Sequence, residues 1–87
     1  MLSLRDCLDF CDLTDDDVAL VAEHEHLPRE IAAHVTCGLV QTPEGVVAVS
    51  QIMEDLIERA EHRGELDRAR HVRSVCTRFL ATHPLAH

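Results

Sequence analysis

"TPEGVVAVSQIMEDLIERAEHRGEL", residues 42–66, decides the fold of this chain. Thr42 is a typical helix N-cap, Pro43 suits the first helical position, and Gly64 is a typical helix stop. Between them, apolar residues recur every three or four positions, at Val46, Val49, Met53, Leu56 and Ala60. This spacing predicts one long amphipathic helix. The turn "HRGEL" is so short that the next helix must return antiparallel to the first.

The returning helix is predicted over about residues 65–82. Its apolar side carries Leu66, Ala69, Val72, Cys76, Phe79 and Leu80, and Pro84 prevents its extension. The two helices are each roughly 18–20 residues long, or about 30 Å at 1.5 Å per residue. Together they form an αα-hairpin that turns at Gly64.

Shorter helices precede the hairpin. Thr14 caps a helix whose first turn contains three aspartates, and Leu13 can pack on Val18 as a hydrophobic staple. Pro28 breaks this helix, and the helical pattern then continues to Cys37 and stops at Gly38. A short helix capped by Ser3 comes first. No alternating β pattern competes, so the predicted fold is all-α: a small antiparallel bundle forming one domain over residues 1–87.

Composition excludes several functions. The 87 residues have a formal net charge of −8. Residues 1–44 hold ten acids and two arginines, while residues 45–87 hold six of each. Such acidity repels phosphate backbones and anionic lipid, so neither nucleic acid nor a membrane is an expected partner. A DNA-binding helix-turn-helix would require a basic recognition helix, and only the last helix is basic.

The chain also lacks the motifs of common enzymes. It contains no lysine for a Schiff base, no phosphate-binding glycine loop, no nucleophile elbow and no His-Glu-x-x-His zinc motif. The N-terminus is neither a signal peptide nor a membrane span. We therefore expect a non-enzymatic protein of the cytoplasm, where its four cysteines would remain thiols. Cys7 and Cys11, one turn apart, are either small apolar core residues or a weak redox or soft-metal pair; Cys37 and Cys76 are expected to pack in the core.

"AEHEHLPREIAAH", residues 22–34, is the main candidate for a metal site. At 100° per residue, four side chains follow one stripe if Pro28 leaves the helical register intact: Glu23, His26, Glu30 and His34. Such ligands suit Fe, Mn or Zn, and Glu23 and His26 have the Glu-x-x-His spacing of di-iron bundles. The alternative is a solvated face with Glu–His and Glu–Arg pairs. The same projection places His24, Ile31 and Val35 on the core side, with His24 as a hydrogen-bonded histidine at the core edge.

A counterpart for this metal site is missing from the same chain. The other candidate ligands, Glu54, Glu58 and His62, project away from the core stripe of their helix. A complete site would therefore need two copies of the chain. The arginines around the hairpin turn, Arg59, Arg63, Arg70 and Arg73 with Arg68 and Arg78 nearby, form either an anion or acidic-partner site or a surface paired with the acidic N-terminal half.

The broad apolar face of residues 46–60 indicates an interface. Six side chains of this helix would provide it: Val46, Val49, Ile52, Met53, Leu56 and Ile57. A bundle of this size is not expected to cover them all, and an uncovered apolar patch favours association. We therefore predict an accessory protein acting through self-association or a protein partner. The alternative is a metal-binding helical protein using the Glu/His stripe, completed across a dimer.

Overall fold

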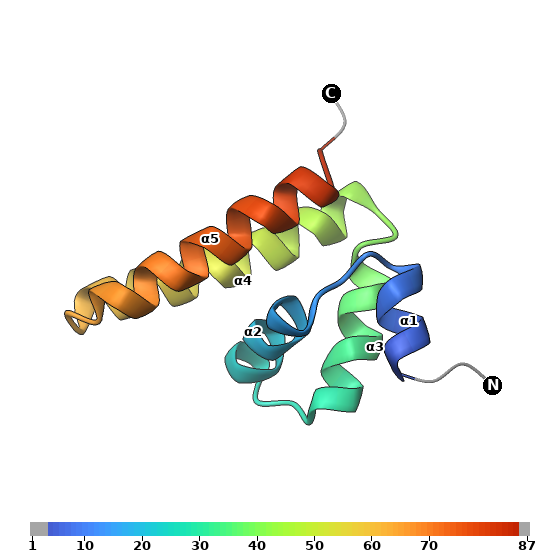
Figure 1. The fold of residues 1–87 in the computed structure, drawn as a ribbon, viewed down its shortest axis with the longest axis horizontal. Coiled ribbons are helices and arrows are strands. Elements are labelled where there is room, and N and C mark those ends of the chain that lie inside the picture. Colours follow the sequence, from blue (N-terminus) through green and yellow to red (C-terminus); the bar gives the residue numbers. More distant parts are fainter. Residues whose placement is uncertain (1–3, 86–87) are drawn as a thin grey trace.

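The computed structural model describes residues 4–85 of the chain, and this part is all-α, without a β-strand. Its five helices, shown in Figure 1, are α1 (Leu4–Phe10), α2 (Asp15–Glu25), α3 (Arg29–Leu39), α4 (Pro43–His62) and α5 (Leu66–Thr82). The all-α class and the C-terminal hairpin are confirmed. The proposed cap at Ser3 lies outside the described residues.

The hairpin of α4 and α5 forms one layer of the molecule. The two helices run antiparallel over their whole length, and α2 and α3 lie to one side of them with α1 beyond α3 (Figure 1). The principal extents of 43 × 33 × 16 Å describe a thin molecule. Little material therefore separates the core from solvent along the shortest axis.

Helix boundaries follow the local sequence. Thr14 and Asp17 form a reciprocal capping box at the start of α2, where the Asp17 N–H donates to Thr14 Oγ1 and the Thr14 N–H donates to Asp17 Oδ2. Thr42 caps α4 by accepting from the Gly45 N–H at 3.0 Å, with Pro43 at the first position. Gly64 has φ 73°, a left-handed conformation that glycine adopts at no steric cost. These three boundaries lie where the sequence predicts them.

The core is almost entirely aliphatic. Six of its side chains, two from each of three helices, are at most 2% exposed: Met53 and Val49 of α4, Val72 and Phe79 of α5, and Val18 and Val21 of α2. The sequence wrongly places Leu66 in this core: it is 63% exposed, because it begins α5 at the hairpin tip, whereas Val75 is buried. Gly38 does not end α3, which continues to Leu39.

Candidate functional site

The apolar side chains of α4 that the sequence predicts as an interface lie inside the monomer. Val49 and Met53 are fully buried and Leu56 is 4% exposed. Val46 and Ile57 are buried as well, and Ile52 is half-buried against the core. Helices α5 and α2 cover this face, so most of it is buried within a single copy of the chain. The exposed apolar surface is found elsewhere.

Over the first two turns of α3, the small side chains face inward and the large aliphatic side chains face solvent, whereas Leu39 at its end packs against the core. Ala32, Ala33 and Thr36 are completely buried, with the Thr36 hydroxyl donating to the Ala32 carbonyl at 2.7 Å. Ile31 and Val35, one turn apart, are 50% and 41% exposed. The helical projection of the sequence places these two residues in the core, which is wrong. Small inward residues let α3 approach its neighbours closely, and Ile31 and Val35 are left facing solvent.

The reason for this reversal is a break in the helical register before Pro28. His26 closes α2 in a left-handed conformation with φ 57° and ψ 47°, and the Leu27 N–H donates to the Ala22 carbonyl. Pro28 is extended, with ψ 151°, and α3 starts at Arg29 in a new direction (Figure 1). A spacing of 100° per residue holds only within one continuous helix, and here the chain forms two helices.

The Glu/His stripe is therefore divided between two helices. Glu23, on α2, accepts from Arg68 of α5, and His26 lies at the α2 cap. Glu30 and His34 lie on exposed turns of α3. Within residues 4–85, no three His, Cys, Asp or Glu side chains are placed so that they could hold a metal ion. Only the pair Glu30 and His34 keeps the predicted spacing on one continuous helix.

His24 is confirmed as a hydrogen-bonded histidine at the core edge. Its side chain is 18% exposed, and its Nε2 lies 2.7 Å from Asp55 Oδ2 of α4. Its Nδ1 contacts Glu25 Oε2, and Asp55 also pairs with Arg59 at 2.9 Å. The imidazole thus links two carboxylates, and this array fastens the end of α2 to α4.

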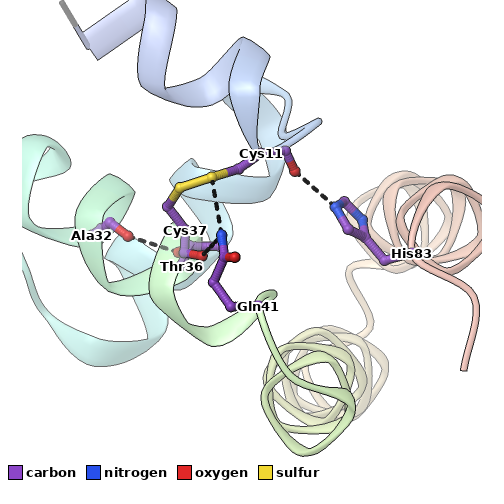
Figure 2. The surroundings of a disulfide bond; sticks show 6 residues. All are labelled: Cys11, Ala32, Thr36, Cys37, Gln41 and His83. Atoms are coloured by element: carbon purple, nitrogen blue, oxygen red, sulfur yellow. Dashed lines mark hydrogen bonds between the residues drawn. A yellow bond between two sulfur atoms is a disulfide. The ribbon is translucent and has the colours of Figure 1, made fainter. Parts of the chain in front are cut away.

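A disulfide between Cys11 and Cys37 fastens the end of α1 to α3 (Figure 2). The two Cα atoms are 5.7 Å apart, although 26 positions separate the residues in sequence. Gln41 Nε2 donates to the Cys37 carbonyl at 3.2 Å, and His83 Nε2 lies 2.9 Å from the Cys11 carbonyl. The prediction of thiols is thus wrong for this pair, because the fold brings together cysteines that are remote in sequence. The side chain of Cys7 lies outside the described part of the chain.

The buried side chains of Asp17 and Cys76 both have a raised pKa. Burial raises the pKa of Asp17, although hydrogen bonds from Thr14 and the nearby His83 act in the opposite direction. Burial, together with the carboxylates Glu54 and Asp17, raises the pKa of the Cys76 thiol, so Cys76 stays protonated and is a poor nucleophile at neutral pH. As predicted, Cys76 packs in the core.

Comparisons with protein-family models, with curated proteins and with solved structures gave no match. Over the described residues, none of the helices is both long enough and apolar enough to cross a membrane. The helical projection of the sequence missed the exposed aliphatic surface of α3, formed by Ile31 and Val35. The sequence does not reveal this surface because the left-handed conformation of His26 interrupts the helical register.

Proposed function

We propose that this chain is a non-enzymatic protein that self-associates through the outer face of α3. One observation carries this proposal: α3 buries alanine and threonine while leaving Ile31 and Val35 exposed. Full burial of an Ile or Val side chain is worth about 1.5–3 kcal/mol. At 50% and 41% exposure, these two residues leave a substantial part of that free energy to be gained on association.

The shape of the face favours a second copy of the chain as the partner. Along α3, Ile31 and Val35 continue into Gly38, which has no side chain and open space beside it. In an antiparallel two-fold pairing, Ile31 of one copy would lie opposite Val35 of the other. The same flank of both helices would then follow one edge of the interface, so that Glu30 of each copy approaches His34 of its partner. The face is therefore complementary to itself in its apolar contacts, and along its edge a carboxylate of one copy faces an imidazole of the other.

The test compares variants at exposed positions, where folding should not suffer. Sedimentation equilibrium of the wild-type chain should give a dimer, and Ile31→Glu with Val35→Glu should give a monomer with unchanged helical circular dichroism. Val47→Glu is the matched control, because Val47 is an exposed aliphatic residue of α4, 36% exposed, outside the α3 face. It should remain a dimer. A monomeric wild-type chain, or equal effects at both surfaces, would contradict the proposal.

A metal-binding role is the second candidate, now reduced to Glu30 and His34. Both side chains are exposed, one turn apart, and make no ion pair with the other described residues. The antiparallel pairing would bring two Glu and two His side chains together, a ligand set suited to Zn, Mn or Fe. If so, Zn²⁺ should tighten the dimer of the wild-type chain but not that of His34→Ala. A dimer that is insensitive to both Zn²⁺ and chelator would remove this role and leave self-association standing.

A further inference from the structure

We propose that the cleft formed by the ends of α2 and α4 and the start of α5 binds a small oxyanion, with a phosphate group as its best ligand. The cleft has a volume of about 160 Å³. Leu56 and Ala60, both buried, lie along it. Three guanidinium groups and an imidazole also line it: Arg59, Arg63, Arg68 and His26. Four cationic or titratable nitrogen groups thus converge in a chain whose net charge is −8.

The three arginines differ in how many hydrogen bonds and ion pairs their guanidinium groups already make within the chain. Arg68 Nη2 donates to Glu23 Oε1, and Arg59 Nη2 lies 2.9 Å from Asp55 Oδ2. The Arg63 side chain has no hydrogen-bond or ion-pair partner among residues 4–85. Glu23 and Glu65 also line the cleft, and Asp55 pairs with Arg59, so the arginines are balanced by an equal number of carboxylates. Arg63 is the arginine of the cleft whose N–H donors no carboxylate of residues 4–85 engages.

The donors of the cleft match a phosphate group. Each guanidinium offers five N–H donors in a planar fork, and the contacts within the chain engage only one nitrogen of Arg59 and one of Arg68. Phosphate accepts paired N–H groups from several arginines at once, whereas a carboxylate has only two oxygens. The start of α5, where Glu65 provides no side-chain cap, adds the positive end of a 17-residue helix at the rim.

The cleft is also open to solvent, so a ligand can enter and leave it. The side chains of Arg59 and Arg68 are 52% and 37% exposed, so an anion can reach their free N–H groups from solvent. The two buried residues exclude water from one side of the site, which strengthens charge-assisted hydrogen bonds there. No residue of α3 lines the cleft, so this site is separate from the proposed self-association face.

The experiment titrates the full chain with inorganic phosphate at low ionic strength, by calorimetry and by amide chemical shifts. We expect saturable binding of one phosphate per chain, with the shift changes concentrated at the ends of α2 and α4 and the start of α5. Arg63→Gln should weaken binding about tenfold or more, as the loss of a charge-assisted bidentate contact implies. Acetate, the carboxylate arm, should bind more weakly than phosphate.

Arg70→Gln is the matched control, because it removes the same charge from the same hairpin. The Arg70 side chain is 80% exposed and does not line the cleft. It should leave phosphate affinity nearly unchanged. Non-saturable binding, equal losses in the two variants, or equal affinity for acetate would overturn the proposal. Sedimentation of Arg63→Gln should match the wild type, so failure at this cleft is distinguishable from failure of self-association.

Discussion

Gly45 and Gly38 show how differently two helical glycines can matter. A Cβ built at Gly45 would lie 1.7 Å from the Leu39 carbonyl oxygen, because the first turn of α4 rests directly on the end of α3. A Cβ at Gly38 would have nothing within 4 Å. The sequence alone does not distinguish them, since the neighbour that decides the matter at Gly45 is backbone from the preceding helix.

Alanine at the two positions should therefore have opposite effects. Gly45→Ala should destabilise the fold by about 1–3 kcal/mol or more, because backbone atoms must move to admit the methyl group. Gly38→Ala should stabilise it by roughly 0.5–1 kcal/mol by removing glycine's flexibility from a helix. Urea denaturation of both variants, at concentrations below self-association, measures the difference. Equal effects of the two substitutions would contradict the close α3–α4 contact.

Asp17 should make stability depend on pH in a defined direction. Its burial raises its folded-state pKa above the ordinary 3.8. Between 3.8 and the raised pKa, the folded state holds more protons than the unfolded state, so this group's contribution falls as pH rises and is constant above that window. Asp17→Asn cannot ionise, yet its amide oxygen can still accept from the Thr14 N–H.

The unfolding free energy of Asp17→Asn, minus that of the wild type, should therefore increase as pH rises from 3.8 and then level off. Chemical denaturation across this range measures it. Asp16→Asn, an exposed change in the same helical turn, controls for loss of one negative charge near the start of α2. A difference that decreases with pH would show that the capping hydrogen bonds outweigh burial at Asp17.

At the scale of elements, α3 is where sequence and structure diverge. Apolar residues of α3 recur at helical spacing on two sides of the helix. One side carries Ile31 and Val35, and the other carries Ala32 and Ala33. Ile31 and Val35 are larger than Ala32 and Ala33, so hydrophobicity alone favours the wrong side. The orientation depends on the dihedral angles of His26 and Pro28 and on how closely α3 must approach its neighbours.

The Cys11–Cys37 disulfide ties two elements and should contribute measurable stability. Closing a loop with a sequence separation of 26 is worth about 3–4 kcal/mol through restriction of the unfolded chain. Cys37→Ser should lose this amount under oxidising conditions, and reductant should destabilise the wild type but not the variant. Non-reducing peptide mapping should recover Cys11 linked to Cys37. Recovery of a different pairing would contradict this arrangement.

For the whole molecule, the aliphatic core stabilises the fold, whereas the surface ion pairs contribute little to stability. Only some of the hairpin arginines pair with the acidic N-terminal half: Arg68 reaches Glu23, whereas Arg73 pairs with Glu61 within the hairpin itself. Such exposed pairs contribute little to stability. The aliphatic core shared by α2, α4 and α5 provides the main driving force for folding. The outer face of α3 and the arginine cleft lie on different elements, so association and anion binding can be tested independently.

The sequence by itself determined most of the helices, the N-caps at Thr14 and Thr42 and the hairpin turn at Gly64, because capping residues, apolar spacing and a short turn act locally. It also determined which face of α4 is apolar and that His24 lies at the core edge. Only the tertiary structure decided that α4's apolar face is covered, that α3 turns Ile31 and Val35 outward, and that Cys11 meets Cys37. These features depend on one left-handed residue and on contacts between distant segments, and neither leaves a periodic signal in the chain.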